Sequence, residues 1–389
     1  MDRTKLLVTA STFPRWKDDT EPRFILDVCK ELNKYFDVTV LVPASPGAKD
    51  NEILEGINVI RYHYFPVHSW ETLCYPGAIV PRIKEKKVRG LLVPFLFLGM
   101  RRNLKKLLPL FDLVHSNWII PQGIIQCGFD KPYVVTGLGG DVSSLNKGWV
   151  LKRKKKCLVE AKAITAVSKS LRNQMLHICP DVKVDVIPMG CEIEQYGKQN
   201  RIINYFGDTK RKVLLFVGRL AEKKGCEYLI RAMDKVEADL IIVGDGPLKR
   251  DLEALAKTVH ADIRFLGAKT KEELRTIYAS SDIFVVPSVT AKDGDKEGVP
   301  TAIIEAMASE LPVIASDSGG ISDIVKDGFN GYLVSEKNVL ELSEKINELI
   351  LDEKKRIIYA ANARLTAEKY DYVEIGKKYR NVFMNIIDR

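Results

Sequence analysis

The second half of the sequence repeats one pattern, a short apolar run that ends in a turn rich in glycine, proline or serine. The runs lie at 213–217, 240–243, 263–266, 283–286 and 312–315. Strands that alternate with helices at this spacing predict βαβ units and a parallel sheet. Because ligands of such sheets bind at the carboxyl ends of the strands, we expect the segments that follow the first four runs to converge on one edge.

The first half carries a similar series of short apolar runs, at 5–10, 38–42, 111–115, 133–136, 164–167 and 184–188. With 389 residues the chain is too long for one ordinary core. We therefore predict an α/β protein with two Rossmann-like, parallel-sheet domains, residues 1–192 and 193–369. A final helix over about 370–389 is expected to return to the first domain.

Two carboxylates mark the stretch from Asp293 to Ala308, which reads D-G-D-K-E-G-V-P-T-A-I-I-E-A-M-A. Proline is well placed at the first turn of a helix, so Glu297 should lie in a loop and Glu305 in the helix that follows. That helix is apolar on nearly every other position, which is typical of a buried helix. A carboxylate there needs a partner, and sugar hydroxyls would be suitable. The alternative is that both glutamates are solvated.

A cationic turn follows the run 213–217 and reads G-R-L-A-E-K-K-G, residues 218–225. It leads into a helix, and such a terminus favours a bound phosphate. Arg219 suits bidentate phosphate contact, and Lys224 supplies a point charge. The turn is neither a Walker loop nor G-x-G-x-x-G. Locally, a capped turn with solvated cations remains the alternative.

The positive charge of the chain belongs to its first half. Residues 1–192 hold 29 of the 60 Lys and Arg residues but only 19 of the 51 Asp and Glu residues. That half should face something anionic. Segment 82–106 has nine basic residues and one acidic residue around L-L-V-P-F-L-F-L-G-M. This core is too short to span a bilayer. Two interpretations stay open: the segment lies on an anionic membrane surface, or it is a buried helix that docks on the same domain and is kinked at Pro94.

Three other features of the first half concern binding. Arg15 lies in the loop 13–23 at a strand end, although an ordinary solvated loop is as good an interpretation. G-L-G-G-D, residues 137–141, offers successive N–H groups for an anion. K-R-K-K-K, residues 152–156, is either a solvated helix face or a binding patch.

The cysteine residues and the lengths of the apolar runs indicate the cellular compartment of the protein. The seven Cys residues are scattered without metal-ligand spacing, which indicates a reducing compartment and no metal site. The apolar part of the N-terminus is too short for a signal peptide. No apolar run reaches the roughly 18 residues that a spanning helix needs. We expect a cytoplasmic protein, peripheral at the inner face of the membrane if segment 82–106 binds lipid.

At this point the motifs resemble a known family. G-R-L-A-E-K-K-G, G-D-G-P, E-G-V-P-T-A-I-I-E and S-G-G occur in the order typical of the retaining glycosyltransferases of family 4, whose GT-B architecture sets two Rossmann-like domains across a cleft. T-F-P-R-W, L-V-P-A-S-P-G and W-I-I-P-Q-G resemble its polysaccharide- or glycolipid-building branch. The resemblance implies transfer of a hexosyl unit from a nucleotide diphosphate sugar to a glycan or lipid-linked acceptor hydroxyl, without a metal or other cofactor.

The resemblance also implies roles for single residues. Catalysis would fall to Glu297, Arg219 and Lys224. The donor would be bound by Gly218, Arg219, Lys224, Asp245, Gly246, Gly267, Glu297, Gly298, Val299, Pro300, Thr301 and Glu305. The acceptor side would include Gly139, Gly140, Asp141, His115 and Arg15.

One departure from the family pattern concerns the reacting centre. Family members often carry a His where this chain has Leu138, and that His lines the donor sugar. His115 is a candidate substitute. Two other functions therefore stay open, a nucleotide-sugar epimerase on the same fold and an inactive donor-binding partner subunit. A nucleic-acid binder, suggested by residues 152–156, is disfavoured by the ordered donor motifs.

Overall fold

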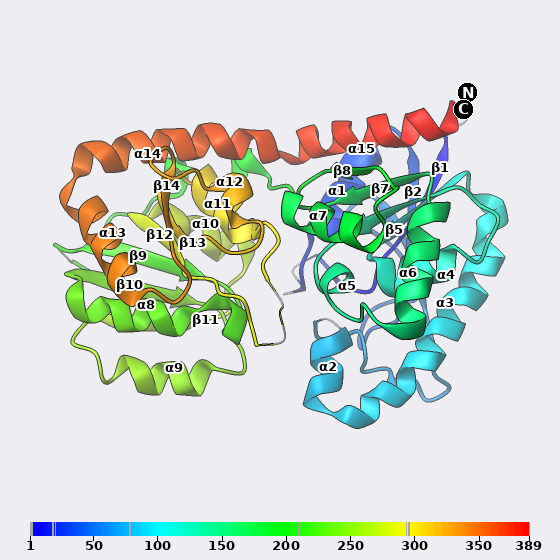
Figure 1. Ribbon diagram of the computed structural model, residues 1–389, viewed down its shortest axis with the longest axis horizontal. Coiled ribbons are helices and arrows are strands. Elements are labelled where there is room, and N and C mark those ends of the chain that lie inside the picture. The colour runs from blue at the N-terminus through cyan, green and yellow to red at the C-terminus, as the bar shows by residue number, and fades with distance from the viewer. Residues whose placement is uncertain are drawn as a thin grey trace. The chain divides into compact units, whose positions relative to one another are not determined.

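The computed structural model describes residues 3–17, 19, 21–77, 79–208, 210–292, 294 and 296–388. Asp293 and Asp295, which belong to the acidic stretch, lie outside the described residues. The chain forms two compact units, one of residues 1–188 with 372–389 and the other of residues 189–371 (Figure 1). The sequence prediction had put the division at residue 192 and the returning helix from about 370.

The first unit is built on an eight-stranded sheet with the order β3-β4-β2-β1-β5-β6-β7-β8. Its strands pair in parallel, except that β3 runs antiparallel to β4. The strands are β1 (Lys5–Thr9), β2 (Asp37–Pro43), β3 (Asn51–Leu54), β4 (Ile57–Tyr62), β5 (Leu113–Asn117), β6 (Tyr133–Gly137), β7 (Ala163–Ala166) and β8 (Val184–Val186). The sequence analysis missed the β3–β4 hairpin.

The first unit also contains eight α-helices among the described residues. They are α1 (Phe24–Leu32), α2 (Ile79–Glu85), α3 (Val93–Leu107), α4 (Ile124–Gln126), α5 (Gly140–Ser143), α6 (Gly148–Glu160), α7 (Lys169–Ile178) and α15 (Tyr372–Ile387). Ser168 caps α7, because its side chain accepts a hydrogen bond from the N–H of Leu171 at 3.1 Å. The last helix, α15, contributes Ile375, Tyr379 and Phe383 to the core of this unit.

Segment 82–106 is not one kinked helix. It begins in α2, passes through a 3₁₀ turn over Lys87–Leu92 and continues in α3. Pro94 is the second residue of α3, where a missing N–H costs no helical hydrogen bond. The predicted kink at Pro94 is therefore wrong.

The second unit is built on a six-stranded, wholly parallel sheet with the order β11-β10-β9-β12-β13-β14 (Figure 1). The strands are β9 (Lys212–Val217), β10 (Ala238–Val243), β11 (Ile263–Gly267), β12 (Ile283–Val286), β13 (Val313–Ser316) and β14 (Gly331–Val334). The last strand, β14, was not predicted from the sequence.

The helices of the second unit are α8 (Cys226–Ala232), α9 (Lys249–Ala256), α10 (Lys271–Ala279), α11 (Thr301–Ala308), α12 (Ile321–Ile324), α13 (Val339–Leu351) and α14 (Glu353–Ala367). A capping box of Thr270 and Glu273 begins α10. The apolar helix α11 is buried, as its composition predicted, with Ile303, Ile304 and Met307 fully enclosed.

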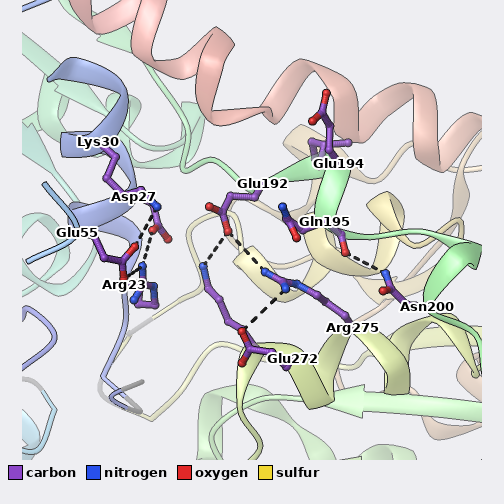
Figure 2. A network of polar contacts seen from close by, with 12 residues as sticks. Arg23, Asp27, Lys30, Glu55, Glu192, Glu194, Gln195, Asn200, Glu272 and Arg275 are labelled. Carbon is purple, nitrogen blue, oxygen red and sulfur yellow. Dashed lines mark hydrogen bonds and ion pairs between the residues drawn. The ribbon is translucent and has the colours of Figure 1, made fainter. Parts of the chain in front are cut away.

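Each unit contains an ion-pair network that joins segments distant in sequence (Figure 2). In the first unit, Arg23 pairs with Glu55 at 2.7 Å and with Asp27 at 3.3 Å, which ties the start of α1 to the β3–β4 turn. Arg23 belongs to the loop 13–23 proposed above, but its guanidinium stabilises the fold. In the second unit, Glu192 lies 3.8 Å from Arg275, which ties the segment that begins this unit to α10.

Candidate functional site

The strand order of the second unit reverses at β9. The chain continues from β9 to β10 and β11 on one side, and β12, β13 and β14 add on the other. Ligands of open α/β sheets bind outside the carboxyl ends of the strands at such a switch point. The turn after β9 and the loop after β12 therefore form the first place to look for a site.

Close backbone packing joins these two segments. Gly225 ends the cationic turn with φ of 61°, and a Cβ there would lie 1.8 Å from the carbonyl oxygen of Pro287. Only glycine fits such an approach in this backbone conformation. The N–H of Val289 donates to the carbonyl of Lys223 at 2.8 Å. The turn that carries the cations is thus fastened to the loop that leads to Glu297.

The turn after β10 interlocks with the same cationic turn. The N–H of Leu220 donates to the carbonyl of Asp245 at 2.9 Å, and the N–H of Leu248 donates to the carbonyl of Leu220 at 3.0 Å. The N–H of Gly244 donates to the carbonyl of Gly267 at 2.8 Å, which brings in the turn after β11. Three of the predicted turns therefore lie side by side.

The turn after β13 completes the convergence. The N–H of Gly320 donates to the carbonyl of Glu297 at 3.0 Å, and a Cβ on Gly319 would lie 2.1 Å from that carbonyl oxygen. The five segments after β9, β10, β11, β12 and β13 are thus linked by backbone contacts. The predicted convergence on one edge is confirmed.

A buried ion pair lies at the switch point. The ammonium of Lys224 is 3.1 Å from Oε1 of Glu297, and the ammonium of Lys223 is 3.8 Å from the same atom. The Glu297 side chain is 9 % exposed and that of Lys224 is 17 % exposed. Burial acts to raise the pKa of Glu297, but the two ammonium charges outweigh it and lower the pKa below its usual value. Glu297 is held as a carboxylate.

Glu305 lies in the middle of α11, where its Oε2 accepts a hydrogen bond from the hydroxyl of Tyr278 at 2.9 Å. Tyr278 is fully buried in α10, so this contact fixes the orientation of the carboxylate. A carboxylate can accept about four hydrogen bonds. The contact with Tyr278 therefore does not preclude hydroxyl groups of a ligand.

The other candidates of this unit lie at the same edge. Gly218 and the exposed Arg219 follow β9 directly. Asp245 is 60 % exposed and accepts hydrogen bonds from the N–H of Gly246 at 2.7 Å and from Lys249 at 3.3 Å. Residues 298–301 lead from Glu297 into α11, with Val299 buried and Pro300 at the N-cap position.

Sequence reasoning missed Glu336, which follows β14. Its carboxylate accepts two hydrogen bonds from Thr290, from the N–H and from the hydroxyl, both at 2.8 Å. Burial acts to raise the pKa of Glu336, but the nearby Ser318 hydroxyl, the hydrogen bonds from Thr290 and the charge of Lys296 together lower it. Glu336 therefore ties the segment after β14 to the loop after β12. No motif marks this residue, because the strand before it was not recognised.

In the first unit, the Asp141 side chain holds the backbone of the glycine turn in place through hydrogen bonds. Its buried carboxylate accepts hydrogen bonds from the N–H groups of Ile119, Leu138 and Gly139, at 2.7, 3.1 and 2.8 Å. Burial raises the pKa of Asp141, and these bonds act against that rise. At Gly139 and Gly140 a side chain would meet open space, because no atom beyond the nearby residues of the chain lies within 4 Å of where its Cβ would be. The carboxylate itself faces the backbone of its own turn and of the segment after β5.

The basic run 152–156 is not a uniform solvated face. Lys154 is fully buried in α6, and its ammonium donates to Oδ1 of Asn146 at 2.8 Å and to the carbonyl of Val142 at 3.4 Å. Burial lowers the pKa of Lys154 to about 8. The other four cations of the run are at least partly exposed. Lys154 therefore stabilises the segment after the glycine turn.

Arg15 is already engaged within the first unit. Its guanidinium pairs with Asp19 through two hydrogen bonds of 3.0 Å and lies 3.9 Å from the ring centres of both Trp16 and Tyr75. These contacts shape the loop 13–23. The third guanidinium nitrogen, Nη1, donates to the carbonyl of Pro46 at 3.2 Å, so all three nitrogens are engaged. The acceptor role for Arg15 stays a prediction.

His115 is placed differently from the prediction. It is buried in β5, its Nε2 lies 2.7 Å from Oγ1 of Thr136, and its ring packs on Tyr379 and Phe383 of α15. Burial lowers the pKa of His115 to about 3. Its ring belongs to the core, so the expectation that His115 replaces the missing histidine of the reacting centre is wrong.

Within the described residues, no group of three or more His, Cys, Asp or Glu side chains is arranged to hold a metal ion. The same residues contain no helix that is both long and apolar enough to cross a membrane.

Comparison with known proteins identifies the class. The family description "Glycosyl transferases group 1" matches residues 198–366, and "Glycosyltransferase Family 4" matches residues 22–195. Two parallel-sheet units with a switch-point site define the GT-B architecture. The chain belongs to the GT-B glycosyltransferases of the family 4 type, and it is therefore a transferase.

Individual relatives agree with this class. An uncharacterized glycosyltransferase of Methanocaldococcus jannaschii is 26 % identical over 354 residues, 86 % of this chain and 93 % of the relative. The amylovoran biosynthesis glycosyltransferase AmsK of Erwinia amylovora is 34 % identical over 205 residues, which is 49 % of this chain and 48 % of AmsK. The latter match thus spans about half of each protein.

Two solved structures share the fold. Sucrose-phosphate synthase of Thermosynechococcus elongatus has a TM-score of 0.81 at 20 % identity, over 99 % of this chain and 100 % of that chain. HepE of Anabaena, solved in complex with UDP and glucose, has a TM-score of 0.74 at 20 % identity, over 98 % of this chain and 100 % of that chain. At these identities the likeness shows the fold.

Proposed function

We propose that the chain transfers a hexosyl unit from a nucleotide diphosphate sugar to a hydroxyl of a glycan or of a lipid-linked glycan, with retention of the anomeric configuration and without an essential metal ion. The observation that carries this proposal is the pair of Lys224 and Glu297 at the switch point of the second sheet. HepE, which shares the fold, was solved with UDP-glucose, and AmsK takes its name from the biosynthesis of a polysaccharide.

The first requirement of the reaction is to stabilise a departing diphosphate. Lys224 is held by Glu297 on a turn that is locked to the neighbouring loop, so its charge is fixed before the donor arrives. Arg219 adds an exposed guanidinium at the end of β9, suited to bidentate phosphate contact. Preorganised charges of this kind lower the barrier because they need no rearrangement during the reaction. They supply the positive charge that a divalent ion would otherwise provide.

The second requirement is to hold the nucleoside and the sugar. Glu305, oriented by Tyr278, would accept hydrogen bonds from the ribose hydroxyls. The segment from Gly298 to Thr301, next to Glu297, would face the donor sugar. In a retaining front-face transfer the departing diphosphate oxygen takes the proton of the acceptor hydroxyl as the new glycosidic bond forms.

A thermal-shift screen with UDP, GDP, ADP and their hexose derivatives would identify the donor. With that donor, product formation should continue in EDTA, and NMR of the product should show the anomeric configuration of the donor. Lys224→Ala should lower the transfer rate at least about tenfold, in keeping with the loss of one charged contact in the transition state. Lys223→Ala, which removes the more distant neighbour of Glu297, is the matched control.

Several outcomes would contradict the proposal. A product of inverted configuration would exclude retention, and loss of turnover in EDTA would exclude metal independence. Conversion of the donor sugar without any acceptor would indicate an epimerase instead. Nucleotide binding with no release of nucleotide under any acceptor would indicate a donor-binding subunit.

A further inference from the structure

Helix α3 exposes apolar side chains on the side that faces away from the core. Leu96, Met100 and Leu104 are buried, each one helical turn from the next. On the opposite side, Phe95 is 41 % exposed and Leu98 is 64 % exposed. We call this side, together with the residues described next, the outward face of α3. A helix that is apolar on both sides has a second surface to cover.

Two further residues extend the outward face. Leu91, in the 3₁₀ turn that leads into α3, is 71 % exposed. Trp70 is 61 % exposed, and its ring stacks on Phe65 with ring centres 5.8 Å apart. Phe65 in turn contacts the ring of Phe95 at 4.9 Å. The tryptophan and the helix therefore form one continuous apolar surface.

Cations flank this surface and carboxylates do not balance them. Lys86 and Lys87 lie just before it, and exposed cations follow it at Arg101, Arg102, Lys105 and Lys106. The acidic residue of the segment, Glu85, is engaged by Arg82 at 2.7 Å and by Arg89 at 2.9 Å. The two arginines thus neutralise the carboxylate, and the remaining cations keep an excess of positive charge.

We propose that the outward face of α3 docks on an anionic lipid surface. Apolar side chains with a tryptophan among them, bordered by lysine and arginine, are the pattern of a segment that lies in the interface plane of a bilayer. Each such cation near anionic lipid strengthens the attraction. The inference rests on the proposed function in that a lipid-linked acceptor would be met at such a surface.

The test uses the full-length protein with vesicles and needs neither donor nor acceptor. Co-sedimentation is measured with phosphatidylcholine vesicles, with and without phosphatidylglycerol, at low and high salt. The variant Leu91→Ser/Phe95→Ser/Leu98→Ser should bind phosphatidylglycerol vesicles at least about tenfold more weakly, because three exposed apolar groups no longer enter the interface. The change lies on solvent-exposed positions, so thermal unfolding should stay close to that of the wild type.

A matched control removes the same number of exposed apolar side chains elsewhere. Ile357, Ile358 and Leu365 of α14 are exposed by 57 % to 63 %. Their triple replacement by Ser should leave vesicle binding unchanged. A charge variant, Lys86→Gln/Lys87→Gln/Arg102→Gln/Lys105→Gln, should remove the preference for phosphatidylglycerol and the sensitivity to salt.

Three results would overturn the proposal. The wild type and the apolar variant could bind vesicles equally well. Binding could depend on the cations alone, which would mean simple surface attraction. Alternatively the wild type could ignore vesicles yet self-associate in sedimentation velocity through the outward face, which would make a second copy its occupant. Because donor and acceptor are absent, none of these results bears on whether transfer itself occurs.

Discussion

Replacing Lys224 by Met should destabilise the second unit by about 3 kcal/mol. Its ammonium lies 3.1 Å from a carboxylate that is 9 % exposed, so the change leaves a buried charge without its nearest partner. Breaking a buried pair by removing one member costs about 3–5 kcal/mol. We expect the lower end of that range because the ammonium of Lys223 remains, 3.8 Å from Oε1 of Glu297.

The loss of the Lys224 charge should also change how the free energy of unfolding depends on pH. In the wild type the pKa of Glu297 is lowered, so its contribution to stability is present above the ordinary glutamate pKa of about 4.3 and is lost as pH falls through the folded value. In Lys224→Met the burial of Glu297 is opposed less, and its pKa should rise above the ordinary value. The variant should then lose stability as pH rises above about 4.3, in the range where the wild-type contribution is constant.

Urea unfolding of the wild type, Lys224→Met, Glu297→Gln and the double variant at pH 5 and at pH 8 would measure this coupling. The double variant should be more stable than Lys224→Met alone, because it removes the unpaired charge. Lys223→Met should cost about 1 kcal/mol or less, since its ammonium is farther away and more exposed. A coupling energy under about 0.5 kcal/mol, or a Lys224→Met variant whose stability does not depend on pH, would refute the reasoning.

Three other predictions concern the fold around the site and the core of the first unit. Gly225→Ala should lower the free energy of unfolding in urea by about 3 kcal/mol or more, because positive φ is strained for alanine and the new methyl group would overlap a carbonyl. Gly267→Ala is the control: its φ is 70° but the space around it is open, so it should lower that free energy by only about 1–2 kcal/mol. Because burial lowers the pKa of His115 to about 3, stability should fall as pH drops below about 6.5, by about 2 kcal/mol at pH 5, and His115→Gln should lack this slope. Glu336→Gln should raise the KM for the donor about fivefold and leave kcat nearly unchanged, because the charged hydrogen bonds to Thr290 are lost. An equal effect on kcat would argue against a role of Glu336 in positioning the loop after β12.

The sequence predicted the second sheet well because its strands are short apolar runs with clear ends. The strand at 283–286 was predicted with its observed bounds, and those at 213–217 and 240–243 differ only at their first residues. The strand at 331–334 was missed since it holds only four residues between a polar turn and charged helices. The β3–β4 hairpin was missed for a related reason, because residues 51–54 are half polar and pair only with a neighbour at the edge.

The residue types of the candidate site were predictable, but their partners were not. The spacing of Glu297 and Lys224 in the chain does not reveal that their charged groups lie 3.1 Å apart, because that distance depends on where Gly225 meets Pro287. His115 illustrates the same limit. Its position near a strand end agreed with a role in catalysis, whereas the packing of α15 places its ring in the core.

The contacts at the switch point distinguish backbone turns that tolerate no side chain from positions where the side chain can vary. At Gly225 and Gly319 a neighbouring carbonyl lies where a side chain would begin, so the backbone of these turns has one arrangement. Arg219, by contrast, is exposed. If the second unit binds the donor as proposed, differences in donor sugar should come from the side chains at 219 and at 298–301. Mutagenesis aimed at changing the transferred sugar should begin with those residues and leave the glycine turns intact.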